Sequence, residues 1–528
     1  MKIRPFVLLA AVALAAALVP ASAPGAASWR ADARTATKGL QRAVATGQLG
    51  PADAAYYRGV VGRAVHALER LPGSRAANLA AVLHDVAAQA GGYIDPRAVT
   101  LFRMLEVNTQ YLARHAVPRP GRDVEDADGI VYRAFPEQGL QFHPLANFAR
   151  LNARLAAHDD HAAELQALAL LQRAVPRAAG LTWEYEFTFG GGRPPWTSGM
   201  VQAVAAQAFA RAGPIDPQFL QVATRAYRAI PGKLLQWVRG VPWIRIYSFS
   251  REAVLNSQLQ TVISLGDYAA LAQDASAGVL AGRLDSAARA LLPRFDTGYW
   301  SLYSLGGPEA TLNYHTYVVT LLAKLAARTK DPFWSQYATR FKAYLTEPPA
   351  LASKGVPGAL YPQPADGFRD SAWVSFWVSK ASRVTVRAAG GVATTRVGEG
   401  WHRLLLRPRP LPPGSYPATL RAVDLAGNEG ELDLPPVELR RDTEPPRVAA
   451  TLSRKRLFWR ASDDATPWLR LTVVLGRDGE HRALPLGRRP LRGSLRLSPP
   501  PGTWSATLVA ADSSGNATRR PLGLLRVG

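Results

Sequence analysis

Hydrophobic positions between residues 31 and 345 recur every three or four residues, which predicts a long series of amphipathic helices. Short breaks rich in Gly, Pro or Asp separate them, as antiparallel helix pairs require. Such pairs either curl into an α/α toroid (an incomplete α/α barrel) with a groove at one end or stack as an open solenoid. We expect the toroid. The predicted helices are one that begins at Pro51 and the segments 76–90, 97–115, 144–158, 162–175, 199–212, 217–229, 252–265, 284–292, 314–327 and 333–345.

After Pro348 the pattern changes to short β-branched and aromatic runs between Gly and Pro turns, for example 372–379, 382–388 and 401–407. The segment GSYPATLRAVDLAGN at 414–428 recurs as GTWSATLVAADSSGN at 502–516, and each copy reads as a strand entering an Asp-x-x-Gly-Asn turn. This repeat predicts two all-β immunoglobulin- or fibronectin-like sandwiches, 349–441 and 442–528. We expect them to serve as spacers or stabilisers, with glycan binding as the alternative.

The first residues show the succession of basic, apolar and small residues that is typical of a secretory signal peptide. Lys2 and Arg4 precede an apolar run at 6–19, and the small residues of Ala21-Ser-Ala23 follow. Cleavage after Ala23 or Ala27 leaves a mature helical domain at 28–348; the rival interpretation is an uncleaved anchor. We assign 1–27 to the signal peptide. The hypothesis is therefore a secreted or cell-surface protein without stable membrane insertion after cleavage.

The amino-acid composition limits the kinds of active site and ligand that the protein can have. The 528 residues include no cysteine, which excludes cysteine catalysis and thiolate metal sites. The net charge of +23 suggests an acidic partner, and outside the cell an anionic polysaccharide fits better than nucleic acid. Coding bias toward Arg, Ala, Gly and Pro would produce the same charge. Aromatic residues gather in the connections 182–189, 243–249 and 299–305, where loops over a helical scaffold favour a carbohydrate site.

Four stretches of the helical domain carry a family pattern. They are QGLQFHPLANFARLN at 138–152, PWTSGMVQAVAAQAFAR at 195–211, YSFSREAVLN at 247–256, and LPRFDTGYWSLY at 292–303 with NYHT at 313–316. In this order they resemble the C-terminal region of the D-glucuronyl 5-epimerases, the heparosan-N-sulfate-glucuronate 5-epimerase type. Two positions depart from the family pattern: Ile246 stands in place of a glutamate, and Gly306 in place of an arginine.

The resemblance implies a 5-epimerase that converts D-glucuronate to L-iduronate residues, or makes an equivalent inversion, in a polysaccharide. Such an inversion needs a base, an opposed acid, and donors or cations around the carboxylate, but no metal or redox cofactor. The implied proton-transfer residues are Tyr314, Tyr303 and Tyr247. Because Ile246 stands where the family has a glutamate, Glu184 and Glu186 are the candidate replacements, with Glu184 assigned as the base.

Further residues are candidates for binding the substrate. The charged, imidazole and indole groups that could neutralise the carboxylate, bond hydroxyls or stack on sugar rings are Glu186, Arg245, Arg251, His315, His143, Trp196 and Trp300. Each also has an alternative role without function. A tyrosine or tryptophan in such a loop commonly packs in the core, and a glutamate or arginine is commonly solvated.

Two other functions remain open. A polysaccharide lyase begins with the same proton removal and then expels the 4-linked sugar. A surface glycan-binding protein would keep the groove without the base, which the departures at Ile246 and Gly306 motivate. A hydrolase needs two opposed carboxylates, and Glu184 and Glu186 are too close along one extended segment. The resemblance also allows a homodimer.

Overall fold

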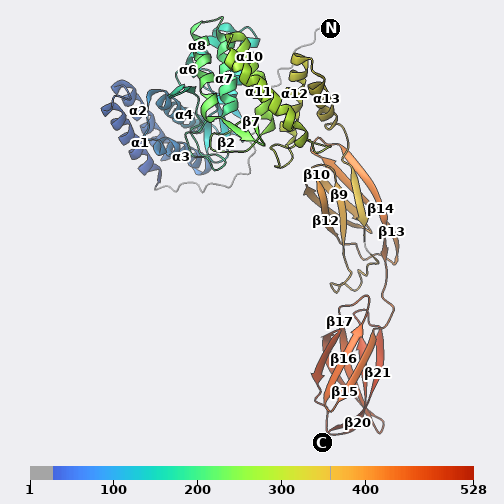
Figure 1. Ribbon diagram of the computed structural model, residues 1–528. Helices are drawn as coiled ribbons and strands as arrows, with labels where there is room; N and C mark the ends of the chain where they lie inside the picture. The colour runs from blue at the N-terminus through green and yellow to red at the C-terminus, as the bar shows by residue number, and fades with distance from the viewer. Residues whose placement is uncertain (1–27, 357, 528) are drawn as a thin grey trace. The chain divides into compact units, whose positions relative to one another are not determined.

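The computed structural model describes residues 28–356 and 358–527, in two compact units that meet between Ala343 and Tyr344 (Figure 1). The predicted signal peptide at 1–27 lies outside the described residues. No helix in the described part of the chain is long and apolar enough to cross a membrane. A helical unit is followed by a β unit, which confirms the coarse architecture expected from the sequence.

The helical unit is a succession of helix pairs with short hairpins between them (Figure 1). Its helices are α1 (Ser28–Ala45), α2 (Pro51–Leu68), α3 (Gly73–Ala88), α4 (Asp95–Arg114), α5 (Pro144–Ala156), α6 (Asp160–Leu171), α7 (Gly199–Ala212), α8 (Gln218–Arg228), α9 (Ile230–Lys233), α10 (Leu255–Ala272), α11 (Ala275–Leu291), the 3₁₀ turn Leu292–Arg294, α12 (Leu312–Thr329) and α13 (Pro332–Ala343). The hairpins are β1–β3 (Asp123–Glu125, Val131–Phe135, Gly139–Phe142), β4–β5 (Val175–Arg177, Gly180–Thr182) and β6–β7 (Leu235–Val238, Val241–Ile244).

Side-chain caps set where several helices begin. His143, Asp159, Ser198 and Asp274 each accept a hydrogen bond from a backbone N–H in the first turn of the helix that follows. The first helices of successive pairs also pack on one another: α5 on α7, α7 on α10, and α10 on α12. One face of these four helices is therefore available to form a shared groove.

Some predicted boundaries were wrong. The helix expected at 252–265 begins at Leu255 and continues to Ala272, and the one expected at 284–292 extends back to Ala275. The aromatic stretch 182–189 is mostly an irregular connection joined to residues 192–196 by two isolated bridges. Strands β2 and β3 were missed because every residue in them is buried, which removes the alternation that identifies a half-buried strand.

The β unit contains two sandwiches of the same topology. In the first, strands order as β12-β9-β8 and β11-β10-β13-β14; in the second, as β15-β16-β19 and β18-β17-β20-β21. The seven strands therefore correspond in order, β8 to β15 through β14 to β21. Their bounds are β8 (Leu351–Gly355), β9 (Ala372–Val378), β10 (Ser382–Ala388), β11 (Gly391–Val397), β12 (Gly400–Leu406), β13 (Gly414–Asp424), β14 (Glu429–Leu439), β15 (Arg447–Ser453), β16 (Arg456–Ser462), β17 (Trp468–Arg477), β18 (Glu480–Pro490), β19 (Arg492–Arg496), β20 (Gly502–Ala511) and β21 (Ala517–Val527).

Alternating burial explains why these segments form sandwiches. Along β9 the residues Ala372, Val374, Phe376 and Val378 face the core while the residues between them are more exposed. The second sandwich repeats this pattern along β20, where Trp504 anchors an equivalent core. A period of two with one buried face is what two packed antiparallel sheets require.

Candidate active site

A groove of about 650 Å³ runs over the helices that open the successive pairs. Its walls come from β2 and from one face each of α5, α7, α10 and α12. The lining polar side chains are Arg133, His143, Asn152, Gln207, Arg211, Gln260, Asp267, Tyr317, Lys324 and Arg328. On α12, positions 317, 324 and 328 recur at helical spacing, so one helix face supplies both the hydroxyl and the cations.

The groove is basic. Four basic side chains line it against a single carboxylate, that of Asp267. Asp267 accepts a hydrogen bond from Arg211 Nη2 at 2.6 Å and forms an ion pair with Arg328, so it holds two guanidinium groups side by side. Lys324 is exposed on the same wall. Because the positive charges in the groove outnumber the one carboxylate, the groove favours a substrate with carboxylate or sulfate groups.

His143 lines the groove with a neutral imidazole. Its Nδ1 accepts from the backbone N–H of Ala146, which assigns the proton of a neutral ring to Nε2. Nε2 is buried and has no hydrogen-bond partner among the described residues. Burial and the neighbouring Arg133 hold the pKa of His143 well below its usual value, so the imidazole is neutral at pH 7. A buried N–H without a partner in a groove wall is a ready donor to a bound sugar.

Arg133 connects the groove to Tyr314. Its guanidinium is held by Asp123 through two hydrogen bonds of 2.7 and 2.8 Å, yet it still lines the groove. Its charge lowers the pKa of Tyr314, against a larger raising effect of burial. The groove cation and the first turn of α12 are therefore close enough to interact electrostatically.

Tyr314, Tyr303 and Tyr247 form one hydroxyl cluster beside the groove, although none of the three lines it. The rings of Tyr303 and Tyr314 are 4.8 Å apart. Burial raises the pKa of all three, and hydrogen bonding with Tyr303 raises those of Tyr247 and Tyr314 further. The same two hydrogen bonds lower the pKa of Tyr303, which marks its oxygen as the acceptor of both and as the hydroxyl of the three that ionises most readily.

An aromatic cluster fixes Tyr247. Its ring lies 5.5 Å from that of Trp196 and 5.6 Å from that of Phe189, and it stacks on Phe249 at 5.4 Å. Trp196 is buried, stacks on Tyr185 and donates its indole N–H to the carbonyl of Phe187. The contacts of Trp196 therefore position Tyr247, and the sequence prediction that Trp196 stacks on a sugar gains no support from them.

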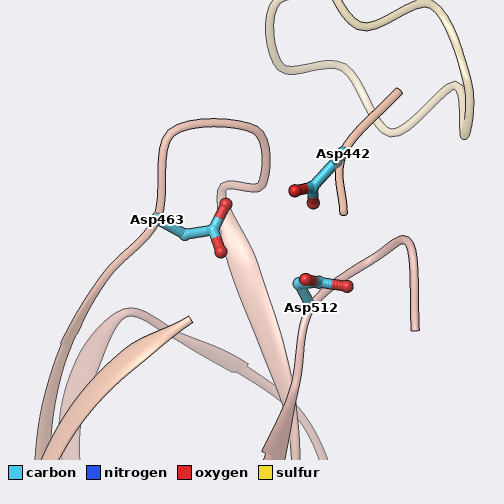
Figure 2. A group of neighbouring side chains, drawn as sticks. All are labelled: Asp442, Asp463 and Asp512. Atoms are coloured by element: carbon cyan, nitrogen blue, oxygen red, sulfur yellow. The ribbon is translucent and has the colours of Figure 1, made fainter. Parts of the chain in front are cut away.

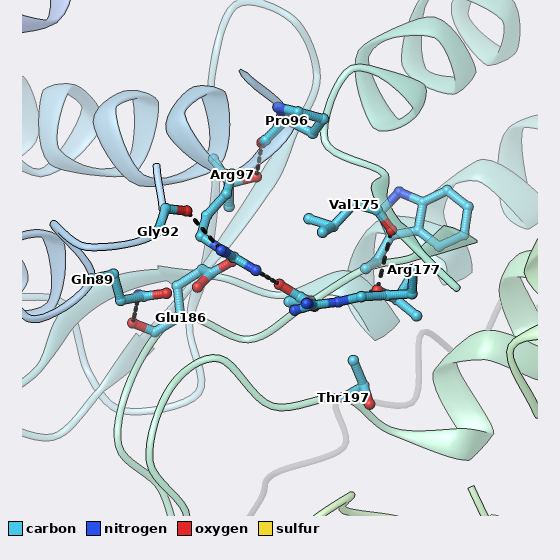
Figure 3. Close-up of polar contacts among 12 residues, drawn as sticks. Gln89, Gly92, Pro96, Arg97, Val175, Arg177, Glu186 and Thr197 are labelled. Atoms are coloured by element: carbon cyan, nitrogen blue, oxygen red, sulfur yellow. Dashed lines mark hydrogen bonds and ion pairs between the residues drawn. The ribbon is translucent and has the colours of Figure 1, made fainter. Parts of the chain in front are cut away.

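The structure places Glu184 in a buried ion-pair network, separate in its contacts from the tyrosines. One oxygen accepts from Arg97 Nη2 at 2.8 Å, and the other pairs with Arg177; both arginines are labelled in Figure 3. Glu186 is also buried, 4.0 Å from Arg97 Nε, and one of its oxygens has no partner. These partners hold Glu184 in a structural role, which argues against it as the base.

The other residues singled out from the sequence divide between core and surface. His315 is buried between Ser301 Oγ at 2.7 Å and the carbonyl of Phe341 at 2.9 Å. Trp300 stacks on that imidazole at 3.9 Å and donates to the carbonyl of Ala310. Arg245 is half-buried with one weak contact to the carbonyl of Ser248, and Arg251 is exposed.

Sequence reasoning missed Arg133, Tyr317 and Glu252. The charge of Glu252 raises the pKa of both Tyr303 and Tyr314, so this carboxylate faces the tyrosine cluster. Glu252 lies five residues after Tyr247, in the connection that leads into α10, and this proximity was the available signal. Arg133 and Tyr317 had no such signal, because only the packing of β2 and α12 brings them to the groove.

The candidate site therefore combines a basic helical groove, a neutral histidine and a neighbouring cluster of tyrosines. Residues 178–343 match the family described as the D-glucuronyl C5-epimerase C-terminus. The resemblance drawn from the sequence motifs is thereby confirmed for this segment, which contains Tyr247, Tyr303 and Tyr314. His143, Arg133 and the first of the four motif stretches lie before the matched residues.

The other comparisons add no functional argument. No curated protein matches the chain. Among solved structures, the fibronectin(III)-like modules of Clostridium thermocellum CbhA are 16% identical, with 34% of this chain and 94% of that chain covered at a TM-score of 0.15. An endoglucanase from Komagataeibacter sucrofermentans is 13% identical, with 37% and 71% covered at a TM-score of 0.27. These scores are too low to carry an inference.

Proposed function

We propose that this protein is a uronate 5-epimerase that acts on an anionic polysaccharide outside the cytoplasm. The observation that carries the proposal is the tyrosine cluster beside a basic groove, within and next to the segment that matches the C5-epimerase family. In this proposal the helix pairs form an α/α toroid, and the polysaccharide lies along its groove. Secretion by the predicted signal peptide and homodimerisation are parts of the same hypothesis.

The groove residues would hold the uronate carboxylate. Arg133 and the Arg211–Asp267–Arg328 group stabilise the negative charge that builds on the carboxylate when carbon 5 loses its proton. The Nε2–H of His143 donates to the carboxylate or to a ring hydroxyl. Because these groups are fixed by Asp123, Asp267 and the α5 cap, little reorganisation accompanies the reaction.

Tyr303 would remove the proton from one face of carbon 5. Its phenolate form, which accepts hydrogen bonds from Tyr247 and Tyr314, takes that proton, and the electron pair of the broken C–H bond moves into the carboxylate to give an enolate. A water molecule in the groove then gives a proton to the opposite face, because hydroxyls joined by a hydrogen bond cannot lie on both faces of the ring. The hydroxide that remains takes the proton from Tyr303, which restores the starting state.

The test is proton exchange in deuterated water. The purified protein is incubated with glucuronate-containing polysaccharides, and deuterium at carbon 5 is read by NMR together with chain length. We expect deuterium uptake in intact chains, and a loss of about 10²–10⁴-fold in rate in Tyr314→Phe and Tyr303→Phe. Tyr111→Phe is the matched control, because Tyr111 lies on α4 outside the groove.

Three results would contradict the proposal. Uptake accompanied by new unsaturated sugar ends would identify a lyase. Tight binding of one polysaccharide with no uptake, unchanged in Tyr314→Phe, would identify a glycan-binding protein. Uptake that survives both tyrosine substitutions would remove the tyrosine cluster from the mechanism.

A further inference from the structure

Three carboxylates meet at one end of the C-terminal sandwich. Asp442 lies before β15, Asp463 follows β16, and Asp512 follows β20, and one oxygen from each lies within 4.8 Å of the others (Figure 2). Asp442 and Asp512 are buried and Asp463 is half-buried. Figure 2 shows the three side chains pointing toward a shared space. Like charges at such distances repel unless something positive lies between them.

Asp442 supplies an unsatisfied acceptor. Its side chain is only 6% exposed, and although Oδ1 accepts from the backbone N–H of Glu444, Oδ2 is buried without a hydrogen bond of good geometry. Among the described residues, no basic side chain forms an ion pair with Asp442, Asp463 or Asp512. A buried carboxylate oxygen without a donor is costly, which itself points to a missing cationic partner.

In the first sandwich a lysine side chain supplies the cation at the corresponding position. Lys380, in the β9–β10 connection, places its ammonium 3.0 Å from Asp424 Oδ2 and donates to the carbonyls of Tyr344 and Glu347. Asp424 opens the same Asp-x-x-Gly-Asn turn that Asp512 opens in the second sandwich. In both turns the asparagine amide bonds the aspartate and also a carbonyl of the segment that enters the sandwich.

The strand correspondence gives the equivalent of Lys380. The β9–β10 connection corresponds to the β16–β17 connection, which carries Asp463. The second sandwich thus has a carboxylate in the connection that carries an ammonium in the first. It also has Asp442 where the first sandwich has Leu345, the residue whose carbonyl accepts from the asparagine of the turn. Together the two changes turn one carboxylate and one ammonium into three carboxylates.

We propose that Asp442, Asp463 and Asp512 bind a calcium ion, which takes the place of the Lys380 ammonium in the second sandwich. The ligands are all hard oxygens, with no cysteine or histidine among them, as calcium prefers. Opposite oxygens around calcium are roughly 5 Å apart, twice a Ca–O distance of about 2.3–2.6 Å, which accommodates the observed spread. The Ser514 hydroxyl, which interacts with Asp442, is a further oxygen at the site.

Calcium titration of the full-length chain, freed of metal by EDTA, tests the site. Isothermal titration calorimetry with CaCl₂ should give one site per chain. Hydrogen exchange should slow several-fold in the peptide 502–516, and the unfolding of the second sandwich should shift upward by at least about 5 °C at saturating calcium. MgCl₂ at the same concentration should give a weaker response, because magnesium sheds its water reluctantly.

Variants separate this site from binding elsewhere. Asp463→Asn should lose the calcium response, whereas Asp478→Asn, the same change in the β17–β18 turn, should keep it. Asp463→Lys should fold with the calcium-bound level of protection and ignore calcium, because it restores the ammonium of the first sandwich. Absence of calcium binding in the unmodified chain, equal binding in Asp463→Asn, or a preference for magnesium would each overturn the proposal.

Discussion

Replacement of Glu186 by glutamine should abolish a decrease in the free energy of unfolding of the helical unit that occurs as the pH rises. Glu186 is 1% exposed; burial, and then the charge of Glu184, raise its pKa from 4.5 to about 8, against the lowering effect of Arg97. At neutral pH the folded protein therefore holds this carboxyl in its protonated form. Glutamine is nearly isosteric with the protonated acid and cannot ionise, so Glu186→Gln keeps the shape and removes the titration.

The magnitude follows from the two pKa values. Between pH 4.5 and about 8 the folded state keeps a proton that the unfolded state has released, so the free energy of unfolding falls as pH rises. The contribution is fully present below pH 4.5, declines by about 1.4 kcal/mol per pH unit, and is lost above pH 8. The total over the window is roughly 4–5 kcal/mol.

Urea unfolding at pH 5, 6, 7, 8 and 9 measures this effect. The helical circular dichroism signal follows the unit that contains Glu186 rather than the sandwiches. The stability advantage of Glu186→Gln over the unmodified protein should grow by about 1 kcal/mol or more per pH unit up to pH 8. Glu69→Gln, an exposed glutamate paired loosely with Arg30, should show no such growth. Parallel pH profiles for the unmodified protein and Glu186→Gln would refute the reasoning.

Three further predictions concern the groove, the core and one turn. Lys324→Gln should weaken the binding of an anionic polysaccharide several-fold and flatten its salt dependence in affinity titrations at two ionic strengths, whereas Lys342→Gln, outside the groove, should change neither. Trp300→Ala should lower the free energy of unfolding by about 3–5 kcal/mol, because the indole is 1% exposed and stacked on His315; weaker ligand binding at unchanged stability would instead favour the sugar-stacking role. Gly180→Ala should destabilise the β4–β5 hairpin against α8, because the added Cβ would lie 2.1 Å from the carbonyl oxygen of Arg225; a melting temperature equal to that of the unmodified protein would contradict the packing.

Local pattern was enough to predict many of the helices and strands. Helices such as Gly199–Ala212 and strands such as Ser382–Ala388 were predicted at their observed bounds, because their apolar spacing and flanking caps or turns are properties of consecutive residues. The motif stretches likewise identified Tyr247, Tyr303 and Tyr314, because the order of four short segments can be read directly from the sequence. Fully buried elements such as β2 escaped prediction, because burial on both faces erases the periodic signal.

Tertiary structure decided which of those residues act together. Trp300 and His315 have the composition of a sugar site, but packing against Ser301 and Phe341 makes them core residues. Arg133 and Glu252 carry no motif, yet folding brings their charges to the tyrosines.

The same division holds in the sandwiches. The repeat containing Asp424 and Asp512 is legible in the sequence. Only the matching strand topology reveals that Lys380 and Asp463 occupy corresponding connections. Periodicity and motifs are set by neighbours along the chain, whereas charge compensation and proton transfer depend on distances between residues that are remote in sequence, which the folded structure alone fixes.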